Sequence, residues 1–84
     1  MKVFFEKRAE RFLKKCDEKL RNRLFEKISC LAENPFPSGE KFKKLIGKKD
    51  TFRLRVGEYR ILYSVDFSTE TIFLRDIFHE HDRY

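Results

Sequence analysis

Three arginines in the central part of the chain have a spacing that could hold an anion. Arg53 and Arg55 alternate with apolar residues, and Arg60 follows a short turn. The planar guanidinium group presents a fork of N–H donors that matches the oxygens of a phosphate. Like charges on adjacent antiparallel strands repel one another unless an anion lies between them. In the alternative interpretation, which stays open here, the arginines pair on an exposed sheet with acids nearby: Glu58, Asp66 or Glu70.

Two histidines near the C-terminus are the side chains whose charge changes near neutral pH without perturbation. His79 and His81 lie on either side of Glu80. Either imidazole could take a proton from an attacking 2′-hydroxyl, or give one to a leaving 5′-oxygen, during cleavage of a phosphodiester. Tyr84 could stack on a base, although chain ends are usually mobile. The alternative for the whole tail is a solvated chain end.

The two cysteines, Cys16 and Cys30, lie on the apolar side of predicted helices. We expect them to be buried thiols that pack as small hydrophobic groups. A zinc site that joins them to His79 and His81 is conceivable, but the spacing matches no Cys-x-x-Cys pattern. No nucleotide-binding fingerprint or catalytic triad stands out either. We therefore expect neither a metal ion nor another cofactor.

The net charge of +6 is concentrated in the middle of the sequence. The chain has 20 Lys and Arg against 14 Asp and Glu, and residues 40–60 contain eight basic and three acidic side chains. A basic stripe on a small domain is typical of a protein that binds a polyanion, whereas a merely solvated surface is the alternative.

The length of 84 residues fits one folded domain over residues 1–84 and leaves no room for a separate cofactor domain. The 10 Phe and 3 Tyr argue against disorder. The longest stretch without a charged side chain is residues 34–39, so no membrane-spanning helix is predicted. The apolar run at the start is too short for a secretory signal, and we expect the chain to be cytoplasmic.

The elements that must position these residues begin with a short strand at residues 2–5 and a helical region. Apolar residues then recur at helical spacing: Ala9, Phe12, Leu13 and Cys16, continued by Leu20, Leu24, Ile28 and Leu31. Asp17 could cap a second helix, but periodicity alone does not choose between one long helix and a hairpin of two. The prolines and glycine of residues 34–39 end the helical region.

Residues 40–50 read as a basic connector with room for one helical turn, after which the period becomes two. Gly57 and Glu58 fit a two-residue hairpin turn between strands at 52–56 and 59–65. A third strand is predicted at residues 71–78, on which Arg75 and His79 share parity and should point to one side. The order predicts an α+β domain whose helices cover one face of a mostly antiparallel sheet, leaving the arginines on the other.

Several of these segments together resemble the RelE/ParE toxin superfamily. They are Asn34-Pro35, the run Phe-Lys-Lys-Leu-Ile-Gly at 42–47, and the Arg-x-Arg-Val-Gly strand followed by Tyr-Arg-Ile-Leu-Tyr at 53–63. The tail, in which His79 precedes Tyr84 by five residues, matches the family's ending. The resemblance implies a β-α-α-β-β-β fold with a helical hairpin on one face of a four-stranded sheet. It also implies a type II toxin–antitoxin system, with an antitoxin that wraps the domain.

For the RelE branch, the resemblance implies cleavage of mRNA in the ribosomal A site, with the ribosome and mRNA as partners. The family's RNA-contacting positions fall here on Arg53, Arg55, Arg60 and Tyr84, with His79 at the terminal histidine. His81 joins them as a candidate catalytic residue. Further basic residues are candidate RNA contacts: Lys43, Lys44, Lys48, Lys49, Arg75 and Arg83.

Two departures from the family bear on this activity. Arg53 and Arg55 stand where some members have lysine, and arginine keeps its proton in proteins, so the general base shifts to a tail histidine. Glu80 stands where many relatives carry arginine, and an acid there would repel the phosphate and weaken stabilisation of developing charge. Two alternatives therefore remain. One is a ParE-like, non-catalytic poison of DNA gyrase, and the other is an inactive relative that binds RNA or the ribosome.

Overall fold

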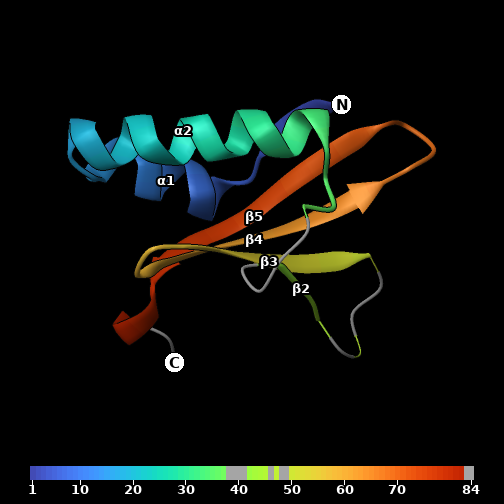
Figure 1. Cartoon of the computed structure of the whole chain (residues 1–84). Helices are drawn as coiled ribbons and strands as arrows, with labels where there is room; N and C mark the ends of the chain where they lie inside the picture. The colour runs from blue at the N-terminus through green and yellow to red at the C-terminus, as the bar shows by residue number, and fades with distance from the viewer. Residues whose placement is uncertain (38–41, 46, 48–49, 83–84) are drawn as a thin grey trace.

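A mixed sheet of five strands, in the order β1-β5-β4-β3-β2, carries both α-helices on one face (Figure 1). The computed structural model describes residues 1–37, 42–45, 47 and 50–82. No helix in this part of the chain is long and apolar enough to cross a membrane. The elements are β1 (Lys2–Phe5), α1 (Lys7–Lys15), α2 (Glu18–Glu33), β2 (Phe42–Lys44), β3 (Thr51–Val56), β4 (Tyr59–Asp66), β5 (Thr71–His79) and the 3₁₀ turn η1 (Glu80–Asp82).

The helical region is a hairpin of two helices, because two side chains satisfy the backbone at the break. The Asp17 carboxylate accepts a hydrogen bond from the backbone N–H of Leu20 at 2.8 Å and so caps α2. The Arg21 guanidinium donates to the carbonyl oxygens of Leu13 at 2.6 Å and Cys16 at 2.7 Å. Those carbonyls lie at the end of α1, where the helix itself leaves acceptors without partners. The hairpin implied by the family resemblance is thus confirmed.

The α+β class is confirmed, and the sheet has one strand more than the four implied by the resemblance. The additional strand is β2, which pairs antiparallel with β3 inside the segment predicted as a connector with one helical turn. The Phe42 ring stacks on Phe52 at a centroid distance of 5.3 Å. Just beyond β2, the Leu45 N–H donates to the Thr51 carbonyl oxygen at 2.9 Å. These contacts favour an extended edge strand over a helical turn.

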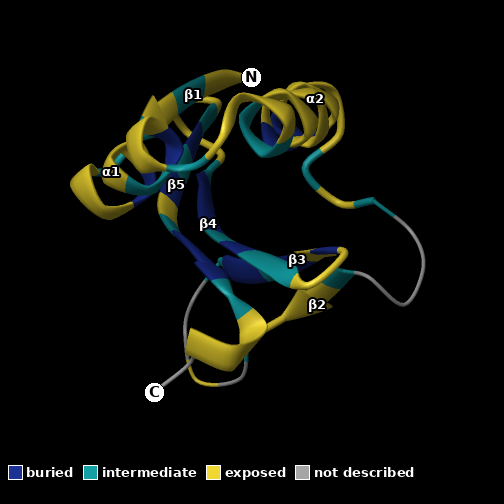
Figure 2. Cartoon of the chain, turned by 90° about the vertical axis from the view of Figure 1, so that its left-hand side faces the viewer, coloured by how far each residue is buried: buried dark blue, intermediate teal, exposed yellow. Residues whose placement is uncertain are grey.

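The hydrophobic core lies between the helices and the sheet, as the dark strands under the helices show (Figure 2). Its sheet side contains the alternating residues predicted for it: Phe52, Leu54, Val56, Ile61 and Tyr63. The cysteines differ from expectation, since Cys16 is half-buried and Cys30 is exposed. Helix α2 buries Ile28, and Cys30 lies roughly 200° around the helix from it. The prediction that Cys30 is buried is therefore wrong.

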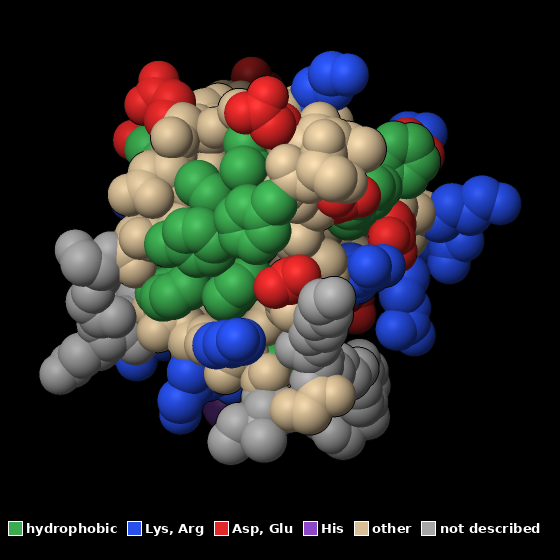
Figure 3. Space-filling view, turned by 90° about the vertical axis from the view of Figure 1, so that its right-hand side faces the viewer, with side chains coloured by type: hydrophobic (Ala, Val, Ile, Leu, Met, Phe, Trp, Pro, Cys, Tyr) green, Lys and Arg blue, Asp and Glu red, His purple; other side chains and the backbone are tan. Residues whose placement is uncertain are grey.

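Aromatic side chains tie the loop after α2 to the sheet. The Phe36 ring lies 5.2 Å from Phe52 and 5.7 Å from Phe67 between centroids. The buried Tyr63 donates its hydroxyl to the Pro35 carbonyl oxygen at 2.7 Å. Phe36 and Phe67 stay exposed, and hydrophobic side chains gather on the side of the molecule that carries the β4–β5 turn (Figure 3). This apolar surface is separate from the arginine-bearing face described below.

A β-bulge in β5 changes which way its side chains point. Leu62 pairs with Asp76 and Tyr63 with Leu74, so Arg75 is an extra residue without an opposite. Arg75 donates to the Ser64 hydroxyl, on the face away from the helices, at 2.6 Å. His79 pairs with Tyr59, whose ring contacts Phe12 of α1 on the helix face. The prediction that Arg75 and His79 point to one side is therefore wrong, because it assumes an unbroken alternation.

Candidate functional site

Four cations join Arg75 on the sheet face that is turned away from the helices, which we call the outer face: Lys43, Arg53, Arg55 and Arg60. Residues directly opposite each other on paired strands point to the same face. Lys43 of β2 is opposite Arg53, and Arg55 of β3 is opposite Arg60 of β4. The predicted placement of the three arginines is confirmed. Lys44 has the other parity, being opposite the core residue Phe52.

Arg53 and Arg55 make no ion pair with any residue that the structure describes. The acids proposed as their partners are engaged elsewhere or lie apart from them. Glu58 faces His79, and Asp66 accepts a hydrogen bond from the Ser68 hydroxyl at 2.6 Å. That hydrogen bond, with others from the same turn, holds the pKa of Asp66 below its ordinary value. As far as the described residues show, the two arginines are available to an external anion.

Arg60 differs from the other two arginines because the protein itself occupies its guanidinium. Its Nη1 donates to the carbonyl oxygens of Gly57 and Tyr59, each at 3.0 Å. Its Nη2 donates to Oε2 of Glu80 at 2.5 Å, and only 13% of the Arg60 side chain is exposed. The backbone N–H of Glu80 in turn donates to the Glu58 carbonyl oxygen at 2.8 Å. The η1 turn is thus fastened to the β3–β4 turn, and Arg60 lies between them.

The two tail histidines lie next to this ion pair. The rings of His79 and His81 stack at a centroid distance of 5.0 Å. The backbone N–H of His81 donates to Nδ1 of His79 at 3.1 Å, and Nε2 of His79 lies 3.4 Å from Oε2 of Glu58. Both ring nitrogens of His79 therefore have partners. His81 is 75% exposed, and its Nε2 lies 4.0 Å from Oε1 of Glu80.

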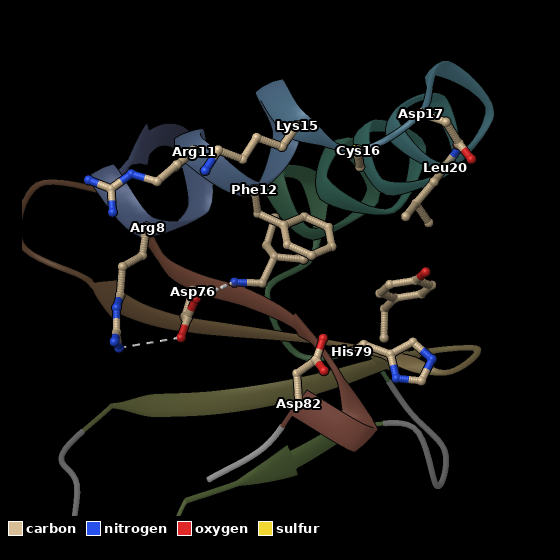
Figure 4. A pocket seen from close by; sticks show the side chains of 12 residues that line it. Arg8, Arg11, Phe12, Lys15, Cys16, Asp17, Leu20, Asp76, His79 and Asp82 are labelled. Carbon is tan, nitrogen blue, oxygen red and sulfur yellow. Dashed lines mark hydrogen bonds and ion pairs between the residues drawn. The ribbon is translucent and has the colours of Figure 1, made fainter.

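A cavity of about 550 Å³ opens on the helix side of the tail, between α1 and the end of β5 (Figure 4). Arg11 and Lys15 extend from α1 on one side, and His79 and Asp82 lie on the other. Arg8 also lines the cavity but is paired with Asp76, at 3.6 Å. These helix cations are not among the residues predicted from the sequence to form a site. The available signal was their spacing, which places them on one side of α1 away from its buried residues.

Arg75 also points to the outer face, but the protein itself occupies its guanidinium. Arg75 is held by Glu6 at 2.6 Å, in addition to its hydrogen bond with Ser64. Four predicted residues lie outside the described part of the chain: Lys48, Lys49, Arg83 and Tyr84. Among the described residues no group of three or more His, Cys, Asp or Glu could hold a metal ion. The conceivable zinc site of cysteines and histidines is therefore not assembled.

Comparison with known proteins gives both a family and a fold. The family model for the ParE toxin of the type II toxin–antitoxin system, parDE, matches residues 3–84. The structure of the RelB–RelE antitoxin–toxin complex from Methanococcus jannaschii contains a chain 30% identical to this one, with a TM-score of 0.72; the match covers 94% of this chain and 92% of that one. No curated protein matches the sequence.

Two further solved structures share the architecture. The archaeal RelE–RelB complex from Pyrococcus horikoshii OT3 matches at 25% identity with a TM-score of 0.82, over 98% of this chain and 97% of that one. The isolated E. coli RelE toxin matches at 22% identity with a TM-score of 0.80, over 93% of this chain and 82% of that one, and shows the fold alone. The chain therefore belongs to the RelE/ParE superfamily, the toxins of type II toxin–antitoxin systems.

Proposed function

We propose that this toxin is an endoribonuclease that cleaves mRNA in the A site of the ribosome and thereby inhibits translation. The observation that carries the proposal is the pair Arg53 and Arg55 on the outer face, both without an ion-pair partner among the described residues. Directly opposite Arg55 stands Arg60, whose partner Glu80 leads into the tail histidines. The arginines that we propose bind the phosphate would then be adjacent to the side chains that we propose transfer protons.

The chemistry that suits this arrangement is attack of a 2′-hydroxyl on the neighbouring phosphate. Arg53 and Arg55 would hold the non-bridging oxygens and stabilise the charge that develops on them. Arginine does not give up its proton, so proton transfer belongs to the tail. The ribosome would supply the in-line geometry of the substrate, which explains how a site with so few groups could suffice.

A cognate antitoxin is the partner we propose for the resting toxin. The Methanococcus jannaschii and Pyrococcus horikoshii structures are complexes of RelE with RelB. A segment that folds on binding would neutralise the exposed cations of the outer face and block access of RNA to them. Lys43 and Arg55 are both exposed and suited to such a contact.

The second candidate function is poisoning of DNA gyrase without catalysis. The specific observation in its favour is that the matching family model describes the ParE toxin. In that case substitution of His81 would leave toxicity unchanged, and DNA damage would precede any loss of translation. The third candidate is an inactive relative that binds RNA or the ribosome. Glu80 is the reason to consider it, because an acid at this position would repel the phosphate.

The test is primer extension on an mRNA in a reconstituted translation reaction. New 5′ ends at ribosome-occupied codons, absent when ribosomes are omitted, are the expected result. Arg55→Gln should reduce cleavage strongly, while Lys19→Gln, a change to an exposed cation on α2, should not. Intact message with unaffected translation would contradict the proposal and favour gyrase poisoning or an inactive toxin. Intact message with blocked translation would instead favour an inhibitor that only binds the ribosome.

A further inference from the structure

The geometry around Arg60 suggests that this arginine does not bind the substrate directly. Three hydrogen bonds already use its guanidinium, two to carbonyl oxygens of the β3–β4 turn and one to Glu80. Only 13% of its side chain is exposed, against 40% for Glu80. The group that this pair presents to solvent is therefore the carboxylate, not the guanidinium.

We propose that Glu80 is the general base of the cleavage reaction and that Arg60 is a positioning residue for it. This assignment rests on the proposed ribonuclease function. Arg60 fixes Oε2 of Glu80, and the hydrogen bond from the Glu80 N–H to the Glu58 carbonyl fixes its backbone. The second oxygen, Oε1, faces the imidazole of His81 at 4.0 Å and is not fixed by Arg60. A carboxylate held in this way is pre-oriented to accept a proton.

The other candidate bases are less suitable. Arg53 and Arg55 keep their protons. His79 points to the helix face, and its Nδ1 accepts the His81 N–H, so a proton placed there would break that hydrogen bond. The His81 ring stacks on that of His79, but it is 75% exposed and its Nε2 lies 4.0 Å from Oε1 of Glu80. We assign it the complementary role of general acid.

The cleavage step balances with these two groups. Glu80 takes the proton of the 2′-hydroxyl, and the 2′-oxygen forms a bond to phosphorus. The bond from phosphorus to the 5′-oxygen breaks, and protonated His81 gives its proton to that oxygen. The products are a 2′,3′-cyclic phosphate and a 5′-hydroxyl end. Glu80 later releases its proton to water, and His81 regains one from water.

An acid at this position does not oppose phosphate binding, because Glu80 is not a bare charge. The contact of 2.5 Å makes Arg60 and Glu80 a pair with no net charge. The positive charge that attracts phosphate then comes from the neighbours on the outer face that have no ion pair among the described residues: Lys43, Arg53 and Arg55. As Glu80 becomes protonated, the Arg60 charge is uncovered at the moment when negative charge builds on the phosphate.

The test compares Glu80→Gln with wild type in single-turnover cleavage on programmed ribosomes. Glutamine keeps an acceptor for Arg60 but cannot take the proton, so cleavage should slow by about 100-fold or more. Binding to ribosomes should stay unchanged, and the melting temperature should fall by no more than roughly 8 °C, because glutamine removes only the ionic part of the contact with Arg60. A cooperative transition in this range shows that the variant is folded. Glu26→Gln, an exposed acid on α2 away from the outer face, is the matched control and should cleave like wild type.

A message with sulfur in place of the scissile 5′-oxygen separates the base from the acid. A thiolate leaves without protonation, so this substrate should restore cleavage by His81→Asn but not by Glu80→Gln. If Glu80 only competes with phosphate for Arg60, Glu80→Gln will cleave faster than wild type. That result, or equal rates, overturns the assignment while leaving the ribonuclease function intact. A wild-type protein that cleaves no message overturns the function and the assignment together.

Discussion

Replacing Arg60 by alanine should lower the stability of the fold as well as its activity. The side chain is 13% exposed and donates to two carbonyl oxygens and to Glu80. A hydrogen bond from a charged group contributes roughly 1.5–3 kcal/mol when sheltered and less where water competes. Because Glu80 is 40% exposed, we assign about 1 kcal/mol to the ion pair and about 0.5 kcal/mol to each carbonyl contact. The expected loss in free energy of unfolding is about 2 kcal/mol.

Thermal unfolding followed by circular dichroism measures this loss. For a domain of this size, 2 kcal/mol corresponds to a fall in melting temperature of roughly 8–16 °C. Arg55→Ala is the matched control, because it makes the same arginine-to-alanine change in a neighbouring strand and so alters strand propensity equally. The Arg55 side chain is exposed and has no ion pair in the described structure. The Arg55→Ala variant should melt at least about 6 °C above Arg60→Ala. A double-mutant cycle with Glu80→Ala should give a coupling energy of about 1 kcal/mol.

Equal melting temperatures for the two alanine variants would refute this reasoning. So would a coupling energy near zero between Arg60 and Glu80. Either result would mean that the guanidinium is free to meet the substrate, as an arginine on an exposed sheet face would be. Glu80 would then lose the residue that we propose orients it.

The remaining predictions concern the helix break and the core. Asp17→Ala removes the acceptor for the Leu20 N–H and should lower the free energy of unfolding by about 1 kcal/mol in urea denaturation, whereas Lys19→Ala should change it by less than about 0.5 kcal/mol. Burial raises the pKa of Tyr63 above its ordinary value of 10.0, so the unfolded chain loses this proton first and stability should fall as the pH rises above 10. Tyr63→Phe should lower the free energy of unfolding by about 1 kcal/mol at neutral pH, because the Pro35 carbonyl loses its hydrogen-bond donor. The stability of this variant should fall less steeply at alkaline pH than that of the wild type. An equally steep fall in the variant would contradict this explanation.

Residue alternation was sufficient to predict which sheet face carries the arginines. Side chains of a strand point alternately to opposite faces, so the burial of Phe52 and Leu54 places Arg53 and Arg55 on the other side. The break between the helices could not be found in this way, because the apolar spacing continues through it. It depends instead on polar side chains, Asp17 and Arg21, that bind the backbone at the break.

Features that depend on a distant segment were not visible in the pattern. A bulge is a mismatch between two strands, so the residues of β5 alone could not show that Arg75 and His79 point to opposite faces. The pairing of Arg60 with Glu80 joins residues 20 positions apart through the β3–β4 turn and η1. The short strand β2 depends on the contact between the rings of Phe42 and Phe52 on the neighbouring strand β3. Local residue types set none of these contacts by themselves.

The bulge and the η1 turn together determine which tail side chains lie near Arg60. Beyond the bulge, His79 falls on the helix face, next to Tyr59 and away from the arginines. If β5 continued straight, the tail residues would lie beside α1. The η1 turn instead brings Glu80 to Arg60 and places His81 against it. In the proposed mechanism Glu80 and His81 act together at the end of the row that contains Arg55, while the His81 ring stays stacked on that of His79 at 5.0 Å. The two histidines are therefore not equivalent, and we expect substitution of His81 to lower the cleavage rate more than substitution of His79.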